Sequence, residues 1–257
     1  MLLSEAPPER WCGHQATIPC FSLDDHLLIY TRGRCGSTSL QLALRRALGI
    51  PRLPYVPSIQ PHYPPRAKIH TREVATSYMQ HIPSNTTLWL VILVRNPFDR
   101  SQSIFFQNLA RHMGGSLNYS QAQLAVRFTG LAPELTRGIL ETLPSVLGRS
   151  IESPTYNAST RDAWLVAGSV RLLILRAEDS AYWPNIVRRR LGLEITLPEY
   201  HNVGARKWFG SVYKELKAHY AFSRKVVAHA LATDDMRRLY SEQERMSMAR
   251  RALHPRP

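Results

Sequence analysis

Apolar residues gather in four short runs along the chain, and stretches with a helical pattern lie between and after these runs. The run at 88–94, Leu-Trp-Leu-Val-Ile-Leu-Val, is almost unbroken, which is typical of a strand buried on both faces of a parallel sheet. The predicted strands are 26–30, 67–70, 88–94 and 170–175. The predicted helices are 40–48, 97–112, 120–143, one that ends at 191, and others from 209 onward.

Strands that alternate with helices predict an α/β fold with right-handed crossovers. We expect a three-layer α/β/α sandwich with a central parallel sheet, whose ligands bind at the carboxyl ends of the strands. A chain of 257 residues is near the upper limit of one α/β core, so we expect a single domain over 1–257. Within it, we expect 1–25 to be an N-terminal extension, the proline-rich stretch 51–65 a loop, and 250–257 a flexible basic tail.

The segment 31–40, Thr-Arg-Gly-Arg-Cys-Gly-Ser-Thr-Ser-Leu, joins the first predicted strand to the first predicted helix. Its two glycines allow a tight turn that approaches an anion, its hydroxyls can donate hydrogen bonds, and the helix N-terminus adds partial positive charge. The segment therefore predicts a binding site for phosphate or sulfate. The predicted ligand-binding residues are Arg32, Gly33, Arg34, Cys35, Gly36, Ser37, Thr38 and Ser39.

This loop lacks the lysine of a Walker A motif, because Gly36 is followed directly by Ser37. An ordinary ATPase or GTPase is therefore disfavoured. The positive charge comes earlier, from Arg32 and Arg34, so the loop can hold an anion without the usual magnesium-dependent arrangement.

The chain is strongly basic, with 33 Lys and Arg against 19 Asp and Glu and a net charge of +14. Such a charge attracts nucleic acid, anionic membrane surfaces, polyanionic sugars and charged nucleotides alike. No basic segment with interleaved aromatic residues indicates a nucleic-acid motif, so we expect no nucleic-acid partner.

The cysteines Cys12, Cys20 and Cys35 are few and odd in number, as expected in a reducing compartment. The spacing of Cys12, His14, Cys20 and His26 fits no standard zinc pattern, and we expect no metal. The N-terminus lacks the features of a signal peptide, and no apolar stretch approaches the length of a membrane span. We therefore expect a soluble, cytoplasmic protein.

A second motif, Arg-Asn-Pro-Phe-Asp at 95–99 with Ser103 beyond it, closes the run 88–94 and begins the next helix. Together the two motifs resemble those of sulfotransferases that use 3′-phosphoadenosine 5′-phosphosulfate (PAPS). In that superfamily T-x-P-K-S-G-T-T holds the 5′-phosphosulfate, and R-N-x-x-D-x-x-x-S holds the 3′-phosphate. Arg95 and Ser103 stand eight apart, as in the family. The resemblance implies that both bind the 3′-phosphate and that Arg34 replaces the family's catalytic lysine.

The segment 202–214 is similar to the Asn…Lys-Trp-Tyr-Ser signature of a sulfotransferase-like family described as capsular polysaccharide synthesis proteins. Phe209 stands in place of the usual tyrosine. The resemblance implies that Arg206 and Lys207 close over the cofactor. Ser39 occupies the place of the tryptophan that stacks on adenine in cytosolic members, which leaves Trp208 as a candidate for that contact.

His70 ends the predicted strand in Lys-Ile-His, which resembles the Lys-x-His that carries the catalytic base of many sulfotransferases. Histidine titrates near neutral pH and can remove a proton from an attacking hydroxyl. Arginine does not donate a proton as lysine can, so the implied role of Arg34 is electrostatic. Sulfuryl transfer needs alignment, a base and donors on the leaving phosphate, and it requires no metal.

The sequence therefore predicts transfer of a sulfuryl group from PAPS to a hydroxyl of a carbohydrate or other metabolite, with His70 and Arg34 as catalytic residues. The sequence does not identify the small-molecule or glycan acceptor. It does not indicate the oligomeric state either. Two alternatives stay open, a nucleotide-dependent kinase with an atypical phosphate loop and a non-catalytic module that binds acidic polysaccharide.

Structural roles are the alternatives for single residues. Arg95 could form a buried ion pair with Asp99 or Glu178, and His70 could be a solvated or core histidine. Glu178 and Asp179 are expected to cap the helix that follows them.

Overall fold

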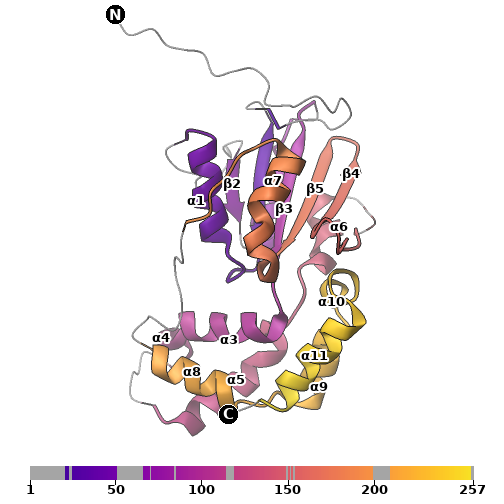
Figure 1. Ribbon diagram of the computed structural model, residues 1–257. Coiled ribbons are helices and arrows are strands. Elements are labelled where there is room, and N and C mark those ends of the chain that lie inside the picture. The colour runs from indigo at the N-terminus through magenta and orange to yellow at the C-terminus, as the bar shows by residue number, and fades with distance from the viewer. Residues whose placement is uncertain are drawn as a thin grey trace, which may run out of the picture.

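The computed structural model describes residues 21–22, 25–50, 66–69, 71–83, 85–113, 119–148, 150, 152, 154–198 and 209–255. A sheet of five strands forms its centre, in the order β2-β1-β3-β5-β4 (Figure 1). The first four strands in this order run parallel, and β4 lies antiparallel to β5 at the edge. The strands are β1 (His26–Thr31), β2 (Arg66–Ile69), β3 (Leu88–Val94), β4 (Ala163–Ala167) and β5 (Val170–Arg176).

Helices cover both faces of the sheet, which explains why every residue of β3 is buried. Leu90 and Ile92 on β3 pack in one core with α2 (Arg72–Gln80) and α6 (Leu143–Leu147). The residues between them face the opposite core, which α1 (Ser37–Ala47) and α7 (Trp183–Leu191) complete. The expected α/β fold, a three-layer α/β/α sandwich around a mostly parallel sheet, is therefore confirmed.

A further layer of helices lies beyond the carboxyl ends of the strands (Figure 1). Aromatic rings join its segments, since Phe128 packs on Phe105 with ring centroids 5.1 Å apart and on Phe222 with centroids 5.6 Å apart. Its helices are α3 (Pro97–Gln107), α4 (Leu109–His112), α5 (Gln121–Leu135), α8 (Gly210–His219), α9 (Arg224–Leu231), α10 (Asp234–Leu239) and α11 (Glu242–Leu253). Two 3₁₀ segments complete the fold, η1 (Leu140–Thr142) and η2 (Ala177–Tyr182).

Two predicted helices are shorter than the sequence pattern indicates. The helix expected over 97–112 breaks at Asn108, which leaves helical geometry at φ −105° and donates a side-chain hydrogen bond back to the Ile104 carbonyl. The helix expected over 120–143 ends at Leu135, and a short connection leads from there to η1.

The expected flexible tail at 250–257 is wrong for its first four residues. Helix α11 continues to Leu253, Ala252 is only 6% exposed, and the Ala252 carbonyl accepts a hydrogen bond of 2.9 Å from the Phe222 amide. The apolar face of the helix holds this segment in place in spite of its arginines. Residues 256–257 lie outside the described part of the chain.

The expected N-terminal extension lies mostly outside the described residues, which begin at Phe21. The Phe21 amide donates a hydrogen bond of 3.3 Å to the Leu191 carbonyl at the end of α7, and its ring packs against Trp89 on the sheet. This end of the segment 1–25 therefore belongs to the packed core.

Candidate functional site

The loop between β1 and α1 contains three residues in the left-handed backbone region. These are Gly33 at φ 85°, Arg34 at φ 60° and Gly36 at φ 82°. Such turns direct successive backbone N–H groups toward a shared concavity that suits an anion. Thr31 supports the turn because its Oγ1 accepts a hydrogen bond of 3.1 Å from the Gly33 amide.

The N-terminus of α1 opens at the same place. The Leu40 amide makes the first backbone bond of the helix, to the Gly36 carbonyl at 3.1 Å, so the amides of residues 37–39 have no intrahelical acceptor. No side chain in the described structure caps this end, and its first turn contains no acidic residue. Donors and a partial positive charge are therefore left for an anionic ligand.

Arg34 adopts a conformation that costs a residue with a side chain about 1–2 kcal/mol. Its Nε donates a hydrogen bond of 3.0 Å to Ser103 Oγ in the middle of α3, which fixes the guanidinium against that helix. Burial lowers the pKa of Arg34, and the positive charge of Arg95 lowers it further. Strain of this kind is typical of functional loops.

Arg95 follows β3 and reaches the same loop. β1 and β3 are paired in parallel with Thr31 beside Leu93, so both chains leave the sheet at one edge. The Arg95 guanidinium donates a hydrogen bond of 3.1 Å to the Arg34 carbonyl. The two sequence motifs, in which Arg34 and Ser103 stand 69 positions apart, thus meet in space.

The ion pairs considered for Arg95 from the sequence are not what the structure shows. Asp99 pairs with Lys217 at 2.8 Å, and Glu178 accepts a hydrogen bond from the Asn96 amide. Within the described part of the chain, neither Arg34 nor Arg95 forms an ion pair with a carboxylate. Two half-buried cations therefore lie together, and no carboxylate of the described segments pairs with either of them.

Arg32 does not join this pair. Its guanidinium donates to the Gly138 carbonyl at 3.1 Å and to the Glu134 carboxylate at 3.3 Å, beside the C-terminal end of α5. A cation is favourable at that end of a helix. Arg32 thus anchors the loop to the helical layer in this structure, and its predicted ligand contact requires the side chain to turn.

Cys35 faces the core rather than the loop's concavity. Its side chain is fully buried, and its Sγ donates a hydrogen bond of 3.2 Å to the Gly33 carbonyl. Burial raises the pKa of the thiol. The predicted ligand contact at Cys35 is one of the backbone amides of the loop, and the buried side chain leaves that prediction unchanged.

Gly36 is required for close packing against the ring of Trp183, which is 1% exposed. A Cβ at Gly36 would lie 2.8 Å from the Trp183 ring. A residue with a side chain would also have to adopt the left-handed backbone conformation of Gly36. Gly36→Ala is expected to lower the free energy of unfolding by about 2–5 kcal/mol, the sum of backbone strain and overpacking.

Gly33→Ala is the matched control, because Gly33 is also left-handed but a Cβ there meets nothing within 4 Å. Gly33→Ala should lower the free energy of unfolding only by the backbone strain, about 1–2 kcal/mol. Urea denaturation of both variants measures the difference, and equal losses would show that Trp183 does not exclude a side chain at Gly36.

Glu178 is a site residue that the sequence analysis assigned to another role. Its carboxylate accepts hydrogen bonds from the Asn96 amide at 2.7 Å and from the Tyr240 hydroxyl at 3.1 Å. It thus holds the residue next to Arg95 in place. The predicted capping role of Glu178 and Asp179 is wrong, because Tyr182 begins α7 without a side-chain cap.

The other predicted site residues, His70, Arg206 and Lys207, lie outside the described residues, as does Trp208. Their immediate neighbours are described. Ile69 ends β2 beside Tyr30 of β1, one residue before the end of that strand. Phe209 is buried and packs on Phe106 of α3, with ring centroids 5.6 Å apart.

Comparison with protein-family models, with curated proteins and with solved structures finds no match. No helix in the described part of the chain is long and apolar enough to cross a membrane. The described residues also contain no cluster of His, Cys, Asp and Glu that could hold a metal ion. The functional argument therefore depends on the arrangement of the residues themselves.

Proposed function

We propose that this protein is a sulfotransferase that transfers the sulfuryl group of PAPS to a hydroxyl of a carbohydrate or another metabolite. The observation that carries the proposal is the joint placement of Arg34 and Arg95 at one edge of the sheet, with no carboxylate partner among the residues that the structure describes. Partly buried cations of this kind favour a ligand with more than one anionic group.

The arrangement fits a nucleotide with anionic groups on both sides of one ribose. The left-handed loop and the open N-terminus of α1 offer backbone donors to the 5′-phosphosulfate. Arg34 adds a fixed positive charge where negative charge builds on the leaving phosphate. Arg95 and Ser103 both contact Arg34, and they are the proposed residues that bind the 3′-phosphate.

His70 is the proposed general base, and Arg206 and Lys207 are the proposed residues that close over the cofactor. These roles rest on the sequence resemblance. The position of β2 supports the first of them, because Ile69 ends that strand at the edge where the phosphate loop begins. Unchanged turnover in His70→Ala would remove this residue from the mechanism.

Calorimetric titration with 3′-phosphoadenosine 5′-phosphate tests the nucleotide site. We expect saturable binding, and Arg95→Ala should weaken it by about tenfold or more through loss of a charge-assisted hydrogen bond. Arg188→Ala, which removes an exposed arginine on α7, is the control of equal charge and should bind as the native protein does. Equal affinity in Arg95→Ala, or preferential binding of ATP with magnesium, would contradict the proposed site.

Incubation with labelled PAPS and a panel of sugars, lipids and small phenols tests the reaction. Transfer of label to any acceptor supports a sulfotransferase. Binding of acidic polysaccharide with steep salt dependence, and no transfer, would favour the non-catalytic alternative.

A further inference from the structure

A cavity of about 520 Å³ lies between the first turns of α3 and the C-terminal ends of α8 and α11. Its inner wall is apolar and buried, with Phe98, Phe222 and Met248. None of the lining residues belongs to the phosphate loop. Arg95 and Ser103 do not line it either, although Asn96 and Asp99 of the same motif do, so the roles proposed above for individual residues do not use this cavity.

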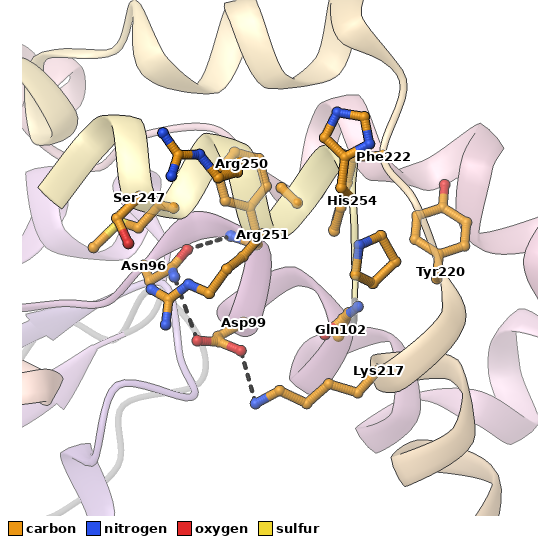
Figure 2. Close-up of a pocket in the computed structure, with 14 residues that line it drawn as sticks. Asn96, Asp99, Gln102, Lys217, Tyr220, Phe222, Ser247, Arg250, Arg251 and His254 are labelled. Atoms are coloured by element: carbon orange, nitrogen blue, oxygen red, sulfur yellow. Dashed lines mark hydrogen bonds and ion pairs between the residues drawn. The ribbon is translucent and has the colours of Figure 1, made fainter. Parts of the chain in front are cut away.

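The rim of the cavity carries an excess of positive charge. Figure 2 shows Asn96, Asp99 and Lys217 joined by a hydrogen bond and an ion pair, with Arg250 from α11 above them and Arg251 beside Asn96 in this view. Lys217 is neutralised by Asp99 at 2.8 Å. The two arginine side chains form no hydrogen bond or ion pair with any described residue, so their charge is available to a ligand.

A buried amide faces the same cavity. Gln102 of α3 is only 4% exposed and lines the cavity wall. Its side chain has no hydrogen-bond partner among the residues that the structure describes. The amide therefore offers one donor group and one acceptor to a ligand in the cavity.

We propose that this cavity binds a small molecule that carries an oxyacid group next to an apolar ring. The guanidinium groups of Arg250 and Arg251 match the forked geometry of phosphate, sulfate or carboxylate. The rings of Phe98 and Phe222, with centroids 5.0 Å apart, offer an aromatic wall to the ring of the ligand. The Gln102 amide is placed to bond to a polar substituent.

The cavity adjoins the proposed nucleotide site but does not share its cations. Asn96 and Asp99 of the second motif line the cavity, whereas Arg34, Arg95 and Ser103 do not. A ligand in the cavity would therefore be bound by Arg250 and Arg251 rather than by Arg34 and Arg95.

Calorimetric titration of the full chain with phenyl phosphate, inorganic phosphate and phenol tests the proposal. Phenyl phosphate combines the anionic group with the ring, and we expect it to bind at least about tenfold more tightly than either fragment. The double variant Arg250→Ala and Arg251→Ala should weaken phenyl phosphate binding by about tenfold or more. The double variant Arg46→Ala and Arg188→Ala removes two exposed arginines elsewhere and should leave the affinity unchanged.

Arg95→Ala separates this site from the nucleotide site, because it should weaken binding of 3′-phosphoadenosine 5′-phosphate and leave phenyl phosphate binding intact. The proposal is overturned if phenyl phosphate does not saturate the native protein. It is equally overturned if the affinity falls in Arg95→Ala while the Arg250 and Arg251 double variant binds normally. Neither result would bear on the sulfotransferase assay.

Discussion

Arg34→Ala is expected to lower the rate of sulfuryl transfer by about 10²- to 10³-fold, the usual cost of removing one preorganised donor at a leaving group. The Arg34 guanidinium is held at 3.0 Å by Ser103, so its position is set before a ligand binds. Its removal should affect turnover at saturating PAPS as well as binding. Initial rates at saturating donor, with the midpoint of thermal unfolding as a check on folding, measure the effect.

Two further substitutions at Arg34 distinguish the effect of its charge on the rate from the effect of its backbone strain on stability. Arg34→Lys keeps the positive charge but loses the planar fork, and its rate should lie between those of the native protein and Arg34→Ala. Arg34→Gly should be as slow as Arg34→Ala but more stable by about 1 kcal/mol, because glycine adopts φ 60° without strain. A native rate in Arg34→Ala would exclude an electrostatic role for this residue.

The parallel part of the sheet was predictable because a strand that is buried on both faces has a nearly continuous run of apolar residues. The strand β3 has the bounds that the run 88–94 indicates, and β5 begins at Val170 as expected. The edge strand β4 was missed. Only its first residue is buried, and the others are partly buried or exposed, so its apolar pattern is weak. A signal for it was nevertheless present, because Gly168 and Ser169 form the two-residue turn of a hairpin with β5.

The layer of helices beyond the strand ends was not predictable as a layer, because contacts between distant segments define it. Phe222 packs on Phe98 and Phe128, and no local pattern reports those partners. The segment near 250 was expected to be a tail because of its arginines. The buried residues Met248 and Ala252 are four apart, and this helical spacing is the signal that the charge obscured.

The meeting of Arg34 with Arg95 follows from a rule that sequence alone can apply, since parallel strands end at one edge of their sheet. The same rule applied to β5 would have placed Glu178 beside Asn96. The direction in which a side chain points does not follow from this rule. Arg32 turns to the Gly138 carbonyl, and only the folded chain brings that acceptor within reach.

Arg176→Met is expected to cause the largest loss of stability, about 3–5 kcal/mol, because it removes the shortest and most buried ion pair of the Asp179 carboxylate. The Arg176 side chain is 7% exposed, and its Nε donates to the Asp179 carboxylate at 2.6 Å. Burial works against the charged form, yet Asp179 outweighs it and raises the pKa of Arg176 overall. The guanidinium also lies 3.9 Å over the centre of the Tyr156 ring, a contact that methionine replaces only in part.

Arg161→Ala is the control for this prediction, because Arg161 contacts the same Asp179 at 3.3 Å from a side chain that is 41% exposed. An exposed ion pair contributes at most about 1 kcal/mol, so Arg161→Ala should unfold at nearly the native urea concentration while Arg176→Met unfolds much earlier. Similar losses in the two variants would mean that Asp179 is solvated when Arg176 is absent. Since Arg176 ends β5 two residues before Glu178, its loss should also loosen the support of Asn96 and weaken nucleotide binding.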